Sequence, residues 1–336
     1  MKDELFSFDD VLLKPQYSNV MSRKDVDLST RIGNLELSVP VFAANMDTVC
    51  EKDMAVAMNG LGGLGILHRN LSVDDRVRTI KELTVIFNSR VGVAVGVNEY
   101  SKEDIEKYAE WGVKAIVLDV AHGDALHVYR AITEIKCFLE RNEYNVCLIG
   151  GNVATGDAVE RMASAGVDCV KVGIGPGAAC LTRVNTGVGV PQLSAIMECA
   201  VRADYLGVSC IADGGIKTPG DVAKAIAAGA DAVMLGGMLA GTDEAPGEVY
   251  TVDGKKVKGY RGMASSGAGS SYVEGAEGHV AHKGPVADVI TSIEHGLRSA
   301  MSYSGAFNIS EFHAKSEFVR VSPASLSENG AHGTTL

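Results

Sequence analysis

Short runs of apolar residues recur along the chain, and longer segments with a helical pattern separate them. Eight of these runs show no clean alternation of apolar and polar positions. Such runs are typical of strands that are buried on both faces, as in parallel sheets. We expect these strands at Val39–Asn45, Gly62–Leu67, Val91–Val97, Lys114–Asp119, Val146–Asn152, Cys169–Gly173, Val208–Asp213 and Ala232–Gly236.

The segments between the runs carry the spacing of amphipathic helices. One of them begins with a strong start signal, because Thr218 supplies a capping hydroxyl directly before Pro219. We expect helices at Asp53–Met58, Val73–Leu83, Ser101–Trp111, Ala125–Leu139, Asp157–Ala165, Gln192–Tyr205, Asp221–Ala228 and Val286–Tyr303.

Eight strand–helix units in one chain predict an α/β fold, the (β/α)8 or TIM barrel, which typically takes about 250 residues. An open, doubly wound sheet is the alternative, but the Gly-x-Gly-x-x-Gly fingerprint of its dinucleotide site is absent after the first strand. Residues 83–90 are too few to hold an inserted domain. We therefore expect residues 1–336 to form a single catalytic domain.

The segment from Gly241 to Lys283 interrupts this rhythm. Val249–Tyr260 has the pattern of a hairpin that turns at Asp253 and Gly254. Arg261–Gly278 is rich in glycine, serine and alanine, which predicts a mobile flap of the kind that covers active sites. An ordinary surface loop is the alternative.

Composition narrows the class of protein. A net charge of −11 argues against a basic groove for nucleic acid, and no apolar run is long enough to span a membrane or to act as a secretory signal. The seven cysteines are widely spaced, with no Cys-x-x-Cys pair and no zinc pattern. We expect a reducing compartment, the cytoplasm, and reduced core thiols at Cys137, Cys147, Cys169, Cys199 and Cys210.

The most informative stretch is the loop that follows the sixth expected strand, Gly173–Arg183. Glycine, alanine and proline dominate it, and glycines let a backbone approach a ligand closely. Cys180 lies near the far end of this loop, and the hydroxyl of Thr182 follows two residues later. This arrangement predicts a covalent nucleophile with a proton-handling neighbour. A small apolar residue in a structural turn is the alternative for Cys180.

Other candidate residues follow the remaining strands, and the carboxyl ends of barrel strands form the active face. Glycine pairs come after the seventh and eighth strands, where barrels often bind phosphate. Asp213, before the first pair, would accept hydrogen bonds from ribose hydroxyls or would simply cap the next helix. The candidates are Asn45, His68, Arg69, Asp119, His122, Asn152, Asp213, Gly214, Gly215, Gly236 and Gly237.

Several motifs in this order resemble the family of inosine monophosphate dehydrogenase and guanosine monophosphate (GMP) reductase. They are Phe8–Leu13, Gly150–Val153, the cysteine loop, Thr186–Gly189, Asp213–Ile216, Tyr260–Met263, Glu274–Gly278 and His282–Pro285. The resemblance implies a barrel assembled as a homotetramer, a purine nucleoside monophosphate as substrate, and a cysteine that bonds to purine C2.

The resemblance also implies roles for particular residues. Cys180, Thr182 and Glu277 would be catalytic, with Thr182 and Glu277 managing protons. Backbone carbonyls of Gly175, Gly177 and Cys180 would bind potassium. Asp119, Ala121 and His122 would face the nicotinamide cofactor. The substrate would contact Asn152, Asp213, Gly214, Gly215, Gly236, Gly237, Tyr260, Gly262, Met263 and Arg69.

Two reactions share this chemistry, and the sequence favours the reductase, which uses NADPH. Ala43–Val49 and Asp119–Gly123 are similar to reductase segments, and no inserted pair of regulatory CBS domains is expected. Dehydrogenases carry an Arg-Tyr pair in the flap that activates water, whereas this chain has Tyr272 and no arginine between Gly262 and Glu277.

Other features favour the alternative, an inosine monophosphate dehydrogenase that uses NAD. His68–Ser72 and Asp243–Glu248 are similar to dehydrogenase segments. Ala178 and Gly237 stand where dehydrogenases carry phosphate-binding serines, so a deoxy or modified purine nucleotide is an alternative substrate. A catalytically silent nucleotide-binding barrel is a third hypothesis.

Overall fold

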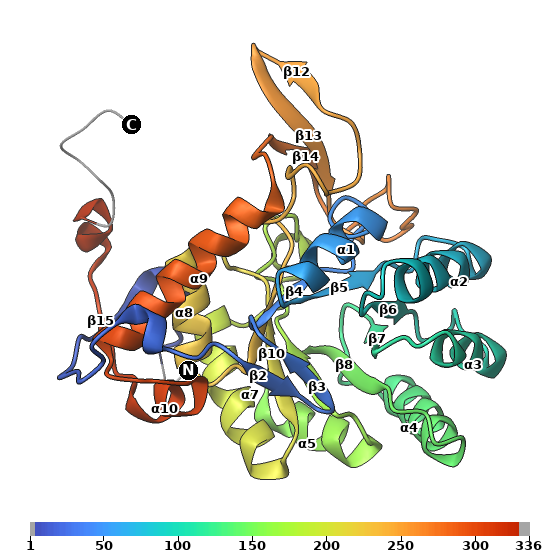
Figure 1. Cartoon of the computed structure of the whole chain (residues 1–336), viewed down its shortest axis with the longest axis horizontal. Coiled ribbons are helices and arrows are strands. Elements are labelled where there is room, and N and C mark those ends of the chain that lie inside the picture. The colour runs from blue at the N-terminus through green and yellow to red at the C-terminus, as the bar shows by residue number, and fades with distance from the viewer. Residues whose placement is uncertain (1–3, 329–336) are drawn as a thin grey trace.

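A closed barrel of eight parallel strands forms the centre of the protein (Figure 1). The computed structural model describes residues 4–328. Neighbouring strands follow the chain order, and the last pairs with the first through Val233 and Val41. The strands are β4 (Val41–Ala43), β5 (Leu64–Leu67), β6 (Gly92–Val95), β7 (Ala115–Asp119), β8 (Cys147–Val153), β9 (Cys169–Val172), β10 (Ser209–Asp213) and β11 (Ala232–Leu235).

The eight expected strands are confirmed, and the open-sheet alternative is excluded by the closure of β11 on β4. The strands are buried along almost their whole length, which explains the uninterrupted apolar runs in the sequence. Lys171 in β9 is the exception in residue type, because it is charged and is nevertheless buried, with an exposed fraction of 3%.

Helices surround the barrel on the outside, and the eight expected helices are confirmed with small shifts of their ends. At the start of one of them, Thr218 accepts a hydrogen bond from the N–H of Asp221 and completes a capping box. The helices are α1 (Lys52–Gly60), α2 (Val73–Lys81), α3 (Lys102–Glu110), α4 (Leu126–Arg141), α5 (Gly156–Ala165), α7 (Gln192–Leu206), α8 (Pro219–Ala227) and α9 (Val286–Tyr303).

Several short elements were not expected from the sequence, because three to seven residues carry too little periodicity to be recognised. They include the N-terminal strand β1, which pairs with β15 near the other end of the chain. These elements are η1 (Phe8–Asp10), β1 (Val11–Leu13), η2 (Arg23–Asp25), β2 (Thr30–Ile32), β3 (Leu35–Leu37), η3 (Glu82–Ile86), α6 (Thr182–Thr186), α10 (Ile309–Lys315), β15 (Phe318–Arg320) and η4 (Pro323–Glu328).

The hairpin is confirmed, but it belongs to a sheet of three strands that projects from the barrel (Figure 1). β12 (Tyr250–Val252) pairs with β13 (Lys255–Arg261), and β13 pairs with β14 (Glu277–Ala281). The last two residues of the expected flap, Glu277 and Gly278, are therefore in a strand. We use the name flap for residues 262–276, which connect β13 to β14.

The cysteine prediction was wrong at one position. Cys137 is exposed on α4, because its place in the helix faces away from the barrel. The other four expected core thiols are buried, and Cys50 is buried as well. Within residues 4–328, no helix has both the length and the apolar character needed to cross a membrane.

Candidate active site

The carboxyl ends of the barrel strands surround a cavity of about 290 Å3. The cysteine loop, the glycine loops after β10 and β11, and the flap form its walls. A larger groove of about 1180 Å3 lies outside the barrel between α4 and α5. None of the sequence-predicted site residues lines that groove, whereas nearly all of them line or adjoin the cavity.

The shape of the cysteine loop depends on glycine at its start. Gly173 has a φ of +149°, and a Cβ there would lie 2.0 Å from the carbonyl oxygen of Asp213. Gly175 also has a positive φ, of +87°. This backbone carries the chain from β9 over the end of the barrel and leaves Cys180 half-buried at the cavity.

Cys180 differs from the buried thiols in its surroundings. Burial raises the pKa of Cys50, Cys147 and Cys199 to about 12, so these thiols stay protonated at neutral pH. Cys180 instead lies next to a proton acceptor, since its Sγ is 3.3 Å from Oγ1 of Thr182. Among the described cysteines, it is the one that lines the cavity.

A chain of hydrogen bonds leads from the thiol to a carboxylate of the flap. The Thr182 hydroxyl, which accepts from Cys180, donates to Oε2 of Glu274 at 2.5 Å. A hydrogen bond of this length to a carboxylate is charge-assisted and strong. The geometry therefore offers a route for a proton between the sulfur and Glu274.

The structure does not bring Glu277 to Thr182, which corrects the sequence-based assignment. Glu277 Oε1 accepts hydrogen bonds from the Ser266 hydroxyl and from the N–H of Gly267. These two donors, the backbone N–H first, lower the pKa of Glu277. The sequence offers two glutamates three residues apart, and only Glu274 bonds to Thr182, whereas Glu277 begins β14 and bonds to Ser266 and Gly267.

Backbone hydrogen bonds join the flap to the cysteine loop. The N–H of Ala276 donates to the carbonyl of Ala179 at 2.9 Å, and the N–H of Leu181 donates to the carbonyl of Glu274 at 2.6 Å. Gly262 fits closely beneath this pairing, because a Cβ there would lie 2.8 Å from the Ala179 oxygen. The main chain thus fixes Glu274 relative to Cys180.

Three polar side chains meet at the centre of the barrel end. Lys171 Nζ donates to Oδ2 of Asp213 at 2.6 Å and to Oδ1 of Asn152 at 2.5 Å. Asn152 also donates to Asp213 at 3.0 Å. Burial by itself would lower the pKa of Lys171, but the carboxylates of Asp213 and Asp119 outweigh burial and raise the pKa. Both donors bind Oδ2 of Asp213, so its other oxygen can accept further hydrogen bonds, such as those of ribose hydroxyls.

The glycine loops present free backbone donors. In the part of the chain that the structure describes, the N–H groups of Gly214, Gly215 and Gly237 make no hydrogen bond to another protein group. Gly214 and Gly215 have φ values of +98° and +79°, which only glycine adopts readily. The hydroxyl of Tyr260 lies beside the second loop, 3.6 Å from where a Cβ of Gly237 would be. Converging N–H and O–H donors of this kind suit a phosphate.

The predicted cofactor residues Asp119, Ala121 and His122 lie at and after the end of β7, and Arg69, which the sequence analysis assigned to the substrate, lies next to Asp119. Arg69 donates to Glu99 at 2.6 Å, and its Nε is 3.7 Å from Asp119. This Nε is buried without a hydrogen-bond partner in the described structure. Ala121 and His122 are exposed beside Asp119, and of these two only Ala121 lines the cavity. An unpartnered donor and a carboxylate at a rim fit a polar ligand such as a nicotinamide amide.

The carbonyls of the cysteine loop are compatible with a cation. Those of Gly175 and Cys180 accept no hydrogen bond within residues 4–328, and that of Gly177 accepts one from the N–H of Cys180. Carbonyl oxygens are the ligands that potassium takes in proteins. Within the same residues, no cluster of His, Cys, Asp or Glu has the arrangement of a transition-metal site.

Two residues of the site were missed from the sequence. Lys171 could have been found as the one lysine inside an apolar strand, because a buried lysine needs a charged partner. Glu274 had no signal of its own, since its sequence neighbourhood resembles that of Glu277.

A comparison of the sequence with family models matches the IMP dehydrogenase/GMP reductase domain over residues 5–332. The chain belongs to this family. Curated relatives carry both names. An inosine-5'-monophosphate dehydrogenase of Cryptosporidium parvum is 37% identical over 389 residues, which covers 98% of this chain and 95% of the relative. A GMP reductase of Leishmania major is 34% identical over 478 residues, which covers 98% of this chain and 97% of the relative.

A solved structure supports the same assignment. It is that of a cysteine-to-alanine variant of GMP reductase from Trypanosoma brucei in complex with guanosine 5'-monophosphate. It has a TM-score of 0.94 and 33% identity to this chain, and the match covers 99% of this chain and 98% of that one. The protein is thus an oxidoreductase of a family that uses nicotinamide cofactors and purine nucleoside monophosphates. Relatives of both activities match at similar identity, so identity alone does not choose between the two reactions.

Proposed function

We propose that the protein is a GMP reductase, which converts guanosine monophosphate to inosine monophosphate and ammonia with NADPH. The observation that carries this proposal is the relay from Cys180 through Thr182 to Glu274, in a flap that has no arginine. The relay handles the protons of an amine leaving group. A dehydrogenase needs in addition a group that activates water for hydrolysis.

The first half of the reaction replaces the amino group at purine C2 by sulfur. Thr182 accepts the proton of the Cys180 thiol and passes its own proton to Glu274. The thiolate then bonds to C2, and the same relay returns the proton to the departing nitrogen, which leaves as ammonia. The product of this half is a thioimidate between Cys180 and C2.

The second half restores the thiol. Bound NADPH would supply the hydride to C2, and the carbon–sulfur bond breaks so that Cys180 leaves as a thiolate. One proton taken up from solvent then restores the thiol. Asp119, Ala121 and His122 would hold the nicotinamide nucleotide at the rim of the cavity, and Arg69 would contact the substrate. Asp213 and Asn152 would bind ribose, and the loops at Gly214, Gly215, Gly236 and Gly237 with Tyr260 would bind the phosphate. Gly262 and Met263 would contact the base.

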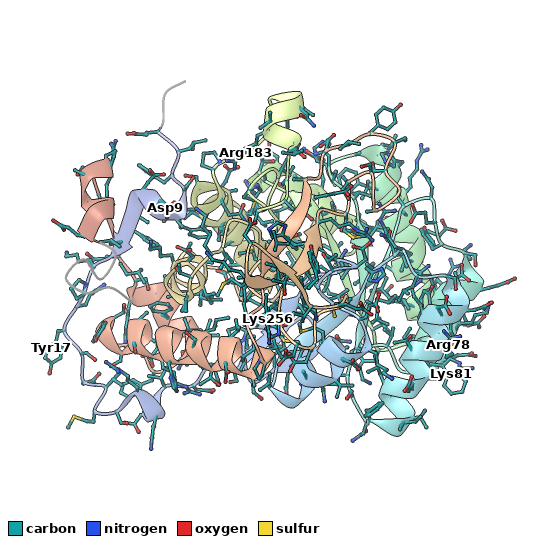
Figure 2. All side chains as sticks on the ribbon, turned by 90° about the horizontal axis from the view of Figure 1, so that it is seen from above. Asp9, Tyr17, Arg78, Lys81, Arg183 and Lys256 are labelled. Carbon is teal, nitrogen blue, oxygen red and sulfur yellow. The ribbon has the colours of Figure 1, made fainter. Side chains whose placement is uncertain are left out.

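The surroundings of the flap support the reductase over the hydrolytic reaction. Tyr272 has an exposed fraction of 86% and is not among the residues that line the cavity. The nearest arginine in sequence, Arg261, is bound to both carboxylate oxygens of Asp47. Arg183, on α6, donates to the carbonyl of Val190 (Figure 2). None of these groups is placed to take a proton from a water molecule at C2.

A potassium ion on the carbonyls of Gly175, Gly177 and Cys180 would fix the cysteine loop. We also propose that residues 1–336 act as one catalytic domain, in a homotetramer in the cytoplasm.

The second candidate is an inosine monophosphate dehydrogenase using NAD, which the dehydrogenase-like segments His68–Ser72 and Asp243–Glu248 favour. The absorbance of reduced nicotinamide separates the two. The reductase predicts a fall with GMP and NADPH and release of ammonia, and the dehydrogenase predicts a rise with inosine monophosphate and NAD. Cys180→Ala should abolish either signal, while Cys137→Ala, which removes the exposed thiol, should leave it unchanged. A rise with the second pair and no change with the first would overturn the reductase.

A further inference from the structure

The glycine loop after β11 is a tight turn whose two faces carry different groups. The N–H groups of Leu239 and Ala240 both donate to the carbonyl of Gly236. Those of Gly237 and Met238 make no hydrogen bond within residues 4–328, and Gly237 lines the cavity. In a helical turn of this kind the N–H groups point towards its start and the C=O groups towards its end, so the carbonyls of Gly237 and Met238 face away from the free donors.

A lysine ammonium binds these two carbonyls. Lys283 Nζ donates to the Gly237 oxygen at 2.6 Å and to the Met238 oxygen at 3.0 Å. Lys283 comes shortly after β14, so it belongs to the segment that connects the projecting sheet to α9. Its two hydrogen bonds hold the turn in the orientation that presents the free N–H groups to the cavity.

A second lysine supports the continuation of the same loop. Lys258 in β13 is buried, and its ammonium donates to the carbonyls of Thr242, Asp243 and Ala245 at 3.1, 3.2 and 2.5 Å. Within the described residues, no carboxylate forms an ion pair with Lys258 or with Lys283. Both positive charges are therefore directed at the backbone of the loop.

The cavity itself offers little positive charge for a phosphate. Arg69 and Lys171 are the cationic side chains among its described lining residues. Arg69 is bound to Glu99, and Lys171 is bound to Asp213 and Asn152. Ala178 and Gly237 supply no hydroxyl. In a chain of net charge −11, a phosphate at this loop depends on backbone N–H donors and on charge behind them.

We propose that Lys283 is a positioning residue for the substrate phosphate, acting through the carbonyls of Gly237 and Met238. Lys258 fixes the following residues of the same loop. This inference rests on the proposed function only in that the substrate is a nucleoside monophosphate. It holds for either GMP or inosine monophosphate.

The test compares three variants of the full chain. Lys283→Met removes the charge and both hydrogen bonds, and Lys283→Arg keeps a donor cation. Lys256→Met is the matched control, because Lys256 is an exposed lysine of β13 whose ammonium makes no hydrogen bond in the described structure (Figure 2). The measurements are kcat and KM for the nucleotide that the wild-type protein turns over, and the inhibition constant of ribose 5-phosphate.

Loss of a charge-assisted hydrogen bond predicts that Lys283→Met raises KM and the inhibition constant about tenfold, while kcat stays within about twofold. Lys283→Arg should recover most of the loss, and Lys256→Met should match wild type. An unchanged KM in Lys283→Met, or a fall in kcat alone, would overturn the inference. If the wild-type protein turns over inosine monophosphate instead of GMP, the reductase proposal fails. The role of Lys283 is then tested by the KM for inosine monophosphate. If calorimetry shows that the wild-type protein binds neither nucleotide, both fail.

Discussion

Replacement of Glu274 by glutamine tests whether Glu274 in the flap, and not Glu277 in β14, accepts the proton of the thiol. Glutamine keeps the size of the side chain and can still accept a hydrogen bond from Thr182, but it cannot take up a proton. The 2.5 Å contact between Thr182 and Glu274 would persist as a neutral hydrogen bond. The expected defect is therefore in proton transfer and not in binding.

The size of the defect follows from the role of the relay. General acid–base catalysis contributes about 10²- to 10⁴-fold, so we expect Glu274→Gln to lower kcat roughly a thousandfold, or about 4 kcal/mol in the barrier. KM for the nucleotide should change little, because Glu274 faces the sulfur and not the phosphate or ribose. Glu277→Gln is the matched control, since that carboxylate is exposed and bonded to Ser266 and Gly267. Its kcat should stay within about twofold, as for most surface substitutions.

The assay is the initial rate of loss of reduced nicotinamide with GMP, under saturating concentrations of both substrates. Intact mass spectrometry of the quenched enzyme gives a second readout, because a defective relay should also reduce the covalent adduct on Cys180. A larger loss of kcat in Glu277→Gln than in Glu274→Gln would refute the assignment of the relay. If both variants retained wild-type rates, neither glutamate would act on the thiol.

Three further predictions rest on burial and close packing. Alkylation of the native protein with iodoacetamide should modify Cys180 and the exposed Cys137. Peptide mapping should find Cys50 and the four other buried thiols unmodified. Rapid labelling of a buried thiol would contradict the packing. The free energy of unfolding should fall as pH rises from 9 to about 12, because Cys50, Cys147 and Cys199 have raised pKa values and keep their protons in the folded state after the unfolded chain has lost its own. Urea unfolding at several pH values measures this slope, and a flat profile would count against it. Gly262→Ala should lower kcat/KM at least about tenfold, because its Cβ would lie 2.8 Å from the Ala179 oxygen and displace the flap. Gly278→Ala is the control, because no atom lies within 4 Å of the added carbon.

The barrel could be predicted from the sequence because its strands are buried on both faces. Runs such as Ala232–Leu235 are continuous in apolar character, and glycine marks the end of this one at Gly236. The small sheet of β1 and β15 could not be predicted, because its two strands come from opposite ends of the chain and have three residues each. Its pairing depends on contacts that no local pattern encodes.

The candidate site likewise has residues that the sequence could predict and residues that it could not. Cys180, Thr182, Asp213 and the glycine pairs follow strands, so the topology of a barrel brings them together. Glu274 reaches Thr182 through the register of the flap against the cysteine loop, and a register cannot be read from residue types. Cys137 was misplaced because its apolar residue type was taken as a sign of burial, although its place in the helix lies opposite the buried residues Ile132, Ile135 and Leu139.

The location of Glu274 has a consequence for the chemistry of the thiol. The barrel supplies the sulfur and the hydroxyl, but the group that accepts the proton comes from the flap, fastened by the hydrogen bonds of Leu181 and Ala276. Nucleophile and base are thus parts of two separate pieces of the molecule. The reactivity of the sulfur therefore depends on a segment outside the barrel, so a substitution that displaces the flap would disarm Cys180 without altering any residue of the barrel itself.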